Sequence, residues 1–185
     1  LNCSCVVYDF RLGASTTLTG RLVTKHMAER INDYTIQKCI HTGGTLIGGD
    51  TDSEYFSIGC KAFRDANPDF VYTKENVTQY VDKLTAYVDG SFAKAMKDHH
   101  HVDDEHADIM HCAREIVGDY GLYIKKKRYA IMVYDDEGHR QDVDGKPGKL
   151  KIRGIQTQRA DMPKAVKKLL KDMLVKVLTG GTEQE

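Results

Sequence analysis

The chain is short of several features that would assign it to a class at once. Its 185 residues contain no apolar run of about 18 residues, so the sequence predicts no membrane-spanning helix. It shows no secretory signal pattern and no basic transit segment. Five cysteines form an odd number without a C-x-x-C pair, which favours reduced thiols over disulfides. We therefore expect no membrane partner and a cytoplasmic location.

An excess of charge of either sign is also absent. The formal net charge is zero, which argues against a wholly basic nucleic-acid-binding protein. The charges are nevertheless unevenly distributed, because residues 61–119 are rich in acids and histidine, whereas residues 125–171 are rich in lysine and arginine. A basic C-terminal part can still bind phosphates locally.

The apolar pattern predicts an α+β fold with an antiparallel sheet flanked by helices. We expect helices over residues 9–33 and 74–97 and a last helix from residue 163 to Gly180. Short strands are predicted at 45–48, 54–58, 109–117, 122–134 and 150–154, with turns at 49–53, 66–69, 135–138 and 144–148. This length suits one compact domain or two small lobes.

Two aspartates stand one residue apart at the predicted tip of the first hairpin, in the stretch IGGDTDSEYFSIG. In an extended strand, this spacing would put Asp50 and Asp52 on the same face. Two close carboxylates repel each other unless a cation neutralises them, and Mg²⁺ and Mn²⁺ prefer oxygen ligands. The pattern therefore predicts either a metal-binding tip or an acidic turn in water.

The segments around this tip resemble the family B DNA polymerases, and in particular the replicative enzymes of T-even-like phages. DTDS followed by EYFSI resembles the second catalytic carboxylate motif, which that family carries on a hairpin of its palm. Four other segments resemble further parts of the family, in the same order along the chain. YDFRLGASTTLTGR (8–21) resembles the stretch after the finger motif, and HCAREIV (111–117) resembles an MDREAI-like strand. KKKRYAI (125–131) resembles the KKRY signature, and KLKIRGIQTQRADMPKAVKKLL (149–170) resembles the entry to the thumb. The resemblance covers nearly the whole chain.

This resemblance implies DNA-directed DNA polymerase activity, in which a primer 3′-hydroxyl attacks a deoxynucleoside triphosphate with the help of two Mg²⁺ or Mn²⁺ ions. It implies that Asp52 is a direct ligand of both metals and that Asp50 is a neighbouring catalytic carboxylate that tunes the site. Glu115 would be a further catalytic acid on an adjacent strand, although Ala113 stands where the phage pattern has an aspartate.

The resemblance also assigns supporting and DNA-binding roles. Thr51 and Ser53 would shape the turn around the aspartates. Contacts to the primer-template duplex would come from Lys126, Lys127, Arg128 and Tyr129, with weaker candidates at Lys151, Arg153 and Arg159. Lysine and arginine neutralise phosphates, and in the minor groove they can donate to acceptors that vary little with sequence. The alternative is that this basic run is a solvated strand edge.

Several parts of the family pattern have no counterpart in this sequence, which begins at Leu1. The first catalytic aspartate, the finger helix that binds the triphosphate, and the exonuclease domain are missing. We therefore expect a fragment, a processed product or an excised segment: residues 1–148 as the C-terminal part of the palm and residues 149–185 as the start of the thumb.

The partners of this chain would be primer-template DNA, a deoxynucleoside triphosphate and the rest of the polymerase, in cis or as a second chain. Alone, it should bind metal weakly and polymerise little; for a viral chain, the location is the host cytoplasm.

Two other classes remain open on the residues alone. A zinc-binding module could draw its ligands from His99, His100, His101, His106, His111 and Cys112, although their spacing fits no standard zinc pattern. A non-catalytic nucleic-acid-binding module could rest on the basic C-terminal half. The second class differs from a polymerase in one testable way, since it should not need Asp50 and Asp52.

Overall fold

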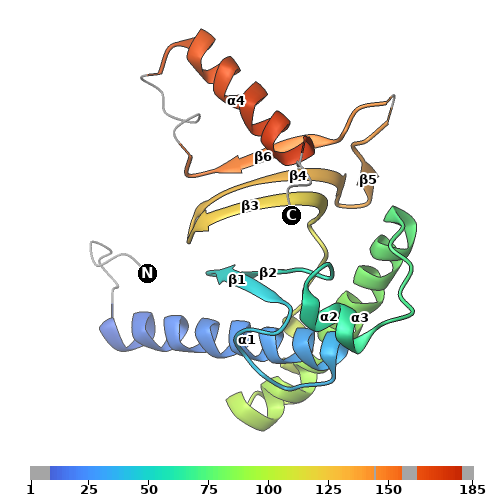
Figure 1. Cartoon of the computed structure of the whole chain (residues 1–185). Helices are drawn as coiled ribbons and strands as arrows, with labels where there is room; N and C mark the ends of the chain where they lie inside the picture. Colours follow the sequence, from blue (N-terminus) through green and yellow to red (C-terminus); the bar gives the residue numbers. More distant parts are fainter. Residues whose placement is uncertain (1–8, 144, 156–161, 181–185) are drawn as a thin grey trace. The chain divides into compact units, whose positions relative to one another are not determined.

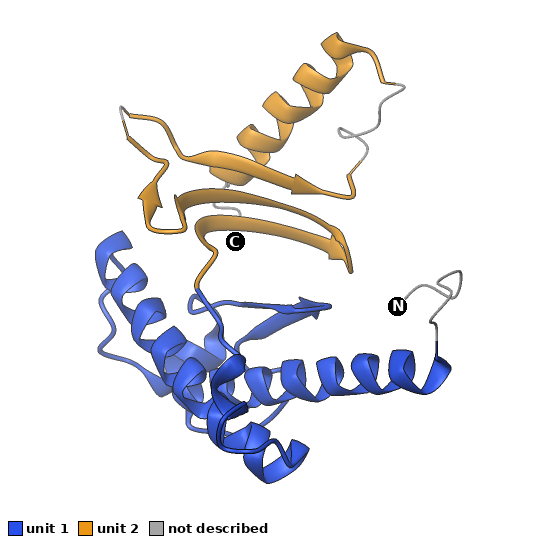
Figure 2. Ribbon diagram, turned by 180° about the vertical axis from the view of Figure 1, so that it is seen from behind, with its two compact units in different colours: residues 1–113 blue, residues 114–185 orange. Residues whose placement is uncertain are grey.

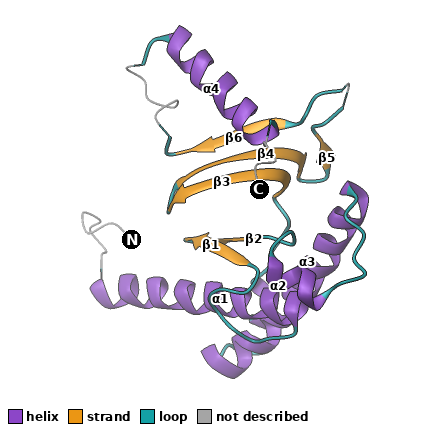
Figure 3. Ribbon diagram, viewed as in Figure 1, coloured by secondary structure: helices purple, strands orange, loops and turns teal. Residues whose placement is uncertain are grey.

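The computed structural model describes residues 9–143, 145–155 and 162–180. The chain divides into two compact units, residues 1–113 and residues 114–185 (Figure 2). Each unit combines helix with antiparallel strands, arranged as a two-stranded sheet in the first unit and a four-stranded sheet in the second (Figure 3). The predicted α+β class is confirmed.

The first unit is built on two long helices, α1 (Phe10–Ile36) and α3 (Lys74–His100) (Figure 1). Each begins at a capping side chain, since Asp9 accepts a hydrogen bond from the backbone amide two residues on and Thr73 from the amide three residues on. The two helices share an apolar core made of Val23, Ile31, Leu84, Val88, Phe92 and Met96.

A hairpin and a short helix lie between α1 and α3 in the sequence. β1 (Leu46–Asp50) pairs antiparallel with β2 (Ser53–Phe56), and α2 (Lys61–Ala66) follows. Leu46 and Phe56 pair at the base of the hairpin and pack against the α1–α3 core. This packing anchors one end of the hairpin to the helices.

The second unit contains β3 (Ile116–Lys125), β4 (Arg128–Asp136), β5 (His139–Arg140), β6 (Lys149–Arg153) and α4 (Lys164–Thr179). β4 is central, because β3 pairs along one of its edges while β5 and β6 pair along the other. α4 lies across one face of this sheet (Figure 1). The core beneath it is made of Leu122, Ala130, Leu150, Ile152, Leu174 and Leu178.

Two predicted strands are wrong. Residues 109–117 are mostly not a strand: a 3₁₀ turn, η1 (Ala107–Ile109), begins this segment, and Met110 and Cys112 pack against the helical core of the first unit. Residues 122–134 are not one strand but parts of β3 and β4, joined by a turn at Lys126 and Lys127. Lys127 adopts a left-handed conformation with φ 62°, which allows the reversal without glycine.

Other boundaries differ by a few residues. α1 continues beyond its predicted end to Ile36, because Asn32, Thr35 and Ile36 are buried. β1 and β2 extend further toward the tip than predicted, which shortens the turn to two residues. The predictions for α3, β6 and α4 are confirmed to within three residues. None of the described helices combines the length and the apolar character needed to cross a membrane.

Candidate functional site

The turn between β1 and β2, residues 50–53, is the first candidate site and is called the acidic tip. Asp50 ends β1, Thr51 and Asp52 form the turn, and Ser53 begins β2. Thr51 is left-handed with φ 58°, and the Asp52 backbone amide donates to the Asp50 carbonyl oxygen at 2.7 Å. Asp52 therefore lies in the turn, so strand alternation does not place the two carboxylates on one face.

Two hydroxyl groups support this turn. The Thr51 hydroxyl donates to Asp50 Oδ1 at 3.3 Å, and the Ser53 hydroxyl donates to the Asp50 carbonyl oxygen at 3.1 Å. Both bonds converge on Asp50, which is partly buried, whereas Asp52 is exposed. The tip thus restrains Asp50 and leaves the Asp52 carboxylate accessible.

The donor atoms of the acidic tip are carboxylate oxygens, which suit Mg²⁺ or Mn²⁺. In the part of the chain that the structure describes, no group of three or more His, Cys, Asp or Glu side chains is placed to hold a metal. Asp50 and Asp52 therefore fit such an ion only as a partial ligand set. Further oxygens would have to come from water, from a phosphate or from carboxylates beyond the described residues.

Glu54 is a third carboxyl in this hairpin, and the sequence motifs did not single it out. It pairs across the hairpin with Gly49, where a Cβ would lie 2.6 Å from Glu54 Oε1, so the glycine makes room for the carboxyl group. Burial raises the pKa of Glu54, because desolvation disfavours the charged form. The only signal in the sequence is an acid within an alternating strand.

The turn between β3 and β4 is the second candidate site and is called the basic tip. The sheet brings together at this end five of the residues predicted to contact DNA: Lys126, Lys127, Arg128, Tyr129 and Arg153. Lys126 and Lys127 form the turn, and both are exposed, as are Arg128 and Arg153. The tip therefore concentrates positive charge that can approach phosphates.

β6 fixes the basic tip from one side. Tyr129 is 8% exposed, pairs with Arg153 of β6 and packs its ring 5.8 Å from that of Tyr123. Gly154 follows β6 with φ +61°, and a side chain there would collide with the Lys127 carbonyl oxygen. Tyr129 thus links the basic tip to β6 and to Tyr123, and Gly154 lets the end of β6 approach the turn closely.

Three further predicted site residues, Glu115, Lys151 and Arg159, lie outside the two tips in the sequence. Glu115 precedes β3, and its carboxylate forms an ion pair with Lys151 of β6. The predicted catalytic acid and a predicted DNA-contact lysine are therefore partners in this structure. Arg159 lies outside the described residues.

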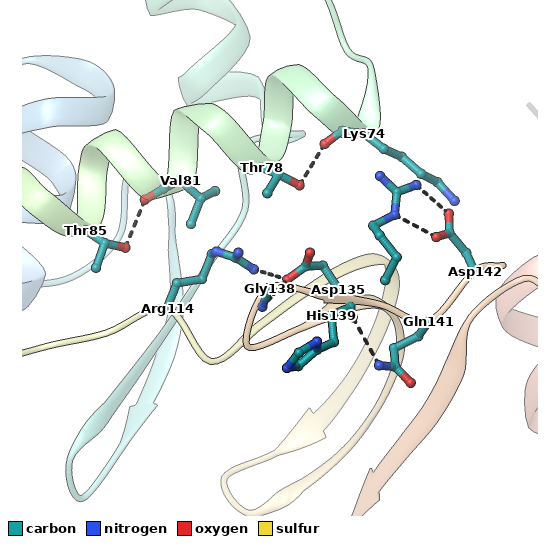
Figure 4. A network of polar contacts seen from close by, with 11 residues as sticks. Lys74, Thr78, Val81, Thr85, Arg114, Asp135, Gly138, His139, Gln141 and Asp142 are labelled. Carbon is teal, nitrogen blue, oxygen red and sulfur yellow. Dashed lines mark hydrogen bonds and ion pairs between the residues drawn. The ribbon is translucent and has the colours of Figure 1, made fainter.

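A buried ion pair lies at the other end of the β3–β4 hairpin. Arg114 pairs with Asp135, and these side chains are only 11% and 4% exposed (Figure 4). Asp135 also accepts a hydrogen bond from the Gly138 backbone amide at 3.0 Å. Nearby, Arg140 donates two hydrogen bonds to Asp142, at 2.8 and 2.9 Å. Charged contacts thus hold the base of this hairpin.

The histidine-rich segment does not assemble a zinc ligand set within the described residues. His106 Nδ1 lies 2.6 Å from Asp103 Oδ1, and His111 Nδ1 lies 3.4 Å from Asp89 Oδ1. The Cys112 backbone amide donates to Asp89 as well, at 2.8 Å. Burial raises the pKa of the Cys112 thiol to about 11.

Comparison with known proteins matches the chain to two phage enzymes. It is 31% identical over 194 aligned residues to the DNA-directed DNA polymerase of Escherichia phage RB69, and 28% identical over 192 to that of Enterobacteria phage T4. These alignments cover 94% and 95% of this chain but only 20% of each polymerase. No family model matches the chain.

The chain therefore spans about a fifth of the length of the curated relatives it matches. The match runs through both the acidic tip and the basic tip, since it includes nearly all of the chain. The resemblance predicted from the motifs is confirmed: this chain is similar, over almost its whole length, to one part of the DNA-directed DNA polymerases of T4-like phages.

Proposed function

We propose that this chain carries part of the active site of a template-directed DNA polymerase, a nucleotidyltransferase of family B type. The observation that carries the proposal is a similarity to two phage DNA polymerases that covers the acidic tip and the basic tip in one alignment. In the terms of that family, residues 1–148 correspond to the C-terminal part of the palm and residues 149–185 to the start of the thumb.

The acidic tip holds the catalytic carboxylates. Asp52 is exposed at the turn and serves as the metal ligand, while Asp50, restrained by Thr51 and Ser53, is the neighbouring carboxylate that orients the turn. Two Mg²⁺ or Mn²⁺ ions, when bound here, would stabilise the charge that develops on the transferred phosphate. Glu115 is a further acid, and its carboxylate is paired with Lys151.

The basic tip binds the primer-template duplex. Lys126, Lys127 and Arg128 are exposed on a turn that β6 supports, so their charges are presented on a fixed end of the sheet. Contacts to phosphates neutralise the backbone without reading sequence, as a polymerase that copies every sequence requires. Arg153 contributes from the adjacent strand, with Lys151 and Arg159 as weaker contacts.

The remainder of the polymerase, in cis or as a second chain, completes the site. The partial ligand set at the acidic tip needs further oxygen ligands. By resemblance, the first catalytic aspartate and the finger helix that binds the triphosphate would belong to that remainder. Primer-template DNA and a deoxynucleoside triphosphate are the substrates. The chain alone polymerises little or nothing.

Primer extension tests the proposal. The chain is assayed alone and with the upstream portion of a related polymerase, with Mg²⁺ and all four triphosphates. We expect extension only in the mixture and its loss in Asp52→Ala. Asp65→Ala, which removes an exposed aspartate of α2, is the matched control and should retain activity.

A non-catalytic nucleic-acid-binding module is the second candidate, favoured by one observation: the basic tip is assembled within the second unit alone. The same experiment separates the two. DNA binding by the chain without extension in the mixture, or extension indifferent to Asp52→Ala, would favour the binding module.

A further inference from the structure

A fully buried amide side chain connects α1 to the chain segment that leads into the β1–β2 hairpin, which carries the acidic tip and is called the acidic hairpin. Asn32, near the end of α1, is 0% exposed, and Thr35 and Thr45 beside it are each 1% exposed. Buried polar groups are costly unless they are hydrogen-bonded. The contacts of Asn32 therefore decide what it does.

The Asn32 side chain uses its full hydrogen-bonding capacity. Its Nδ2 donates to the carbonyl oxygens of Ile40, at 2.7 Å, and Gly43, at 3.2 Å. Its Oδ1 accepts from the Thr45 backbone amide at 3.0 Å and from the Thr45 hydroxyl at 3.1 Å. Four bonds to three points of one loop fix the path of the chain from α1 to β1.

The loop transmits this restraint to the hairpin. Thr45 immediately precedes β1, and its carbonyl oxygen accepts a hydrogen bond from the Ser57 amide, just after β2, at 2.8 Å. Gly44 is left-handed, and a Cβ there would lie 2.5 Å from Asn32 Oδ1, so the loop fits closely over the amide. Asn32 is thus joined through Thr45 to both strands at the base of the hairpin.

Thr35 lies in the same cluster but does not hold the loop in this way. Its hydroxyl donates to the Ile31 carbonyl oxygen within α1 at 2.7 Å and contacts the Thr45 hydroxyl at 3.0 Å. Without the Thr35 hydroxyl, Asn32 would keep both of its bonds to Thr45. Thr35 therefore offers a control with matched burial and position.

We propose that Asn32 is a positioning residue that sets the location of Asp50 and Asp52 by fixing the base of their hairpin to α1. The inference rests on the proposed function, since it concerns the same carboxylates. The Asn32 amide bonds to the base of the hairpin rather than to its tip, so it acts on the aspartates through the Thr45 segment. Its substitution should therefore change how well the acidic tip binds metal rather than remove a ligand.

Hydrogen exchange of the full chain tests the mechanical part of the proposal. In Asn32→Ala, and equally in the nearly isosteric Asn32→Leu, which can form none of these side-chain hydrogen bonds, the amides of Thr45 and Ser57 should exchange about tenfold faster or more, while α3 keeps its protection. Thr35→Val should leave both regions near wild type. Equal loss of protection in the hairpin and α3, or equal effects of Thr35→Val and Asn32→Ala, would overturn it.

The functional part of the proposal is that Asn32 affects metal binding at the acidic tip. It is tested by the metal dependence of primer extension, with the chain mixed with the upstream portion of a related polymerase. For Asn32→Ala, the Mn²⁺ concentration at half-maximal rate should rise about tenfold, since misplaced carboxylates bind the ion less well. Val81→Ala, at a buried position of α3 outside the six residues of the α1–α3 core, should lower only the maximal rate by reducing the folded fraction. An Asn32→Ala variant with a reduced maximal rate and an unchanged midpoint would show that Asn32 is only structural.

The two proposals fail in different ways. If the wild-type mixture shows no metal-dependent extension, the proposed polymerase function has failed. The hydrogen-exchange result then decides on Asn32 alone: selective loss of protection keeps it as the residue that positions the hairpin, and uniform loss or no loss overturns that role.

Discussion

The β1–β2 hairpin and the β3–β4 hairpin have the same turn length and opposite charge. Each reverses direction in two residues and uses a left-handed residue that is not glycine, Thr51 with φ 58° in one and Lys127 with φ 62° in the other. The strands of the acidic hairpin have five and four residues, whereas those of the basic hairpin have ten and nine. The same kind of turn thus presents carboxylates on a short support and cations on a long one.

The two hairpins also differ in what fixes them. The base of the acidic hairpin is tied to α1 by the neutral amide of Asn32, whereas a buried ion pair, Arg114–Asp135, lies at the base of the basic hairpin. Among the described strands, a third one that extends to the tip, β6, is found only at the basic hairpin. The base of the β1–β2 hairpin is therefore held by hydrogen bonds and by the packing of Leu46 and Phe56, whereas the β3–β4 hairpin is held by charge pairing and by packing along its length.

Breaking the charged base should have the largest effect on stability. Arg114→Met leaves Asp135 buried without its partner and should lower the free energy of unfolding of the second unit by about 3–5 kcal/mol. This loss is measured by urea unfolding, in which hydrogen exchange of the β3 and β4 amides reports on the second unit. Lys149→Met removes the partner of Asp136 in a more exposed pair and should cost less than about 1 kcal/mol. Equal losses in the two variants would contradict the assigned role.

Pushing β6 away from the basic tip should have the next largest effect. Gly154→Ala combines a left-handed backbone with a collision at the Lys127 carbonyl oxygen and should cost about 2–4 kcal/mol. Gly145→Ala is the matched control, because Gly145 has φ +72° but open space around it, and should cost about 1–2 kcal/mol. Thermal unfolding of both variants measures the difference, and indistinguishable midpoints would mean that β6 does not constrain the turn.

Removing the charges of the basic tip should weaken DNA binding without unfolding the sheet. In the triple variant Lys126→Ala, Lys127→Ala, Arg128→Ala, we expect about tenfold weaker binding or more. The slope of log K against log salt concentration should become shallower by about 0.9 for each phosphate that the variant no longer neutralises. Fluorescence anisotropy with a primer-template duplex at several salt concentrations measures both quantities.

The matched control for the triple variant removes three exposed lysines of the first unit, Lys25, Lys38 and Lys61. It changes the net charge by the same amount away from the basic tip. Equal weakening in the two triple variants would mean that DNA responds to total charge rather than to the basic tip.

The smallest expected effect concerns Glu54 on the acidic hairpin. Burial raises its pKa in the folded chain above the ordinary value of 4.5, so the folded state holds the proton more tightly and stability falls as the pH rises through the folded pKa. Glu54→Gln should therefore raise the melting temperature by a few degrees at pH 7, about what 1 kcal/mol or less provides, and by less at pH 4. A Glu54→Gln effect that is larger at pH 4 would contradict the sign.

Regular periodicity made the helices predictable, but one turn and one segment were not. α3 and α4 follow apolar spacing and end near the expected residues. The turn at Lys126 and Lys127 lacks the glycine or asparagine that normally marks a two-residue hairpin, so the pattern of the basic run favours a continuous strand. Met110 and Cys112 are apolar enough for a strand, yet they pack on a helical core that sequence periodicity does not reveal.

The candidate site was predictable where a motif carries it and hidden where tertiary contacts do. The DTDS and KKRY motifs single out the residues of both tips without knowledge of the fold, although only DTDS was predicted to lie at a turn. Asn32 gives no signal, because a polar residue near a helix end is ordinarily solvated and only the returning loop buries it. Glu54 is hidden for the same reason, since its burial depends on the glycine across the hairpin.

The bond between Asn32 and Thr45 has a consequence for the time course of folding. It joins positions 13 residues apart, whereas α1 and α3 meet only after a much longer stretch of chain has closed. Loops of about ten residues close within roughly 10–100 ns, and the entropic cost grows with loop length. The end of α1 and the segment before β1 can therefore meet before α1 and α3 do, whereas the base of the hairpin is complete only when Leu46 and Phe56 pack on the α1–α3 core.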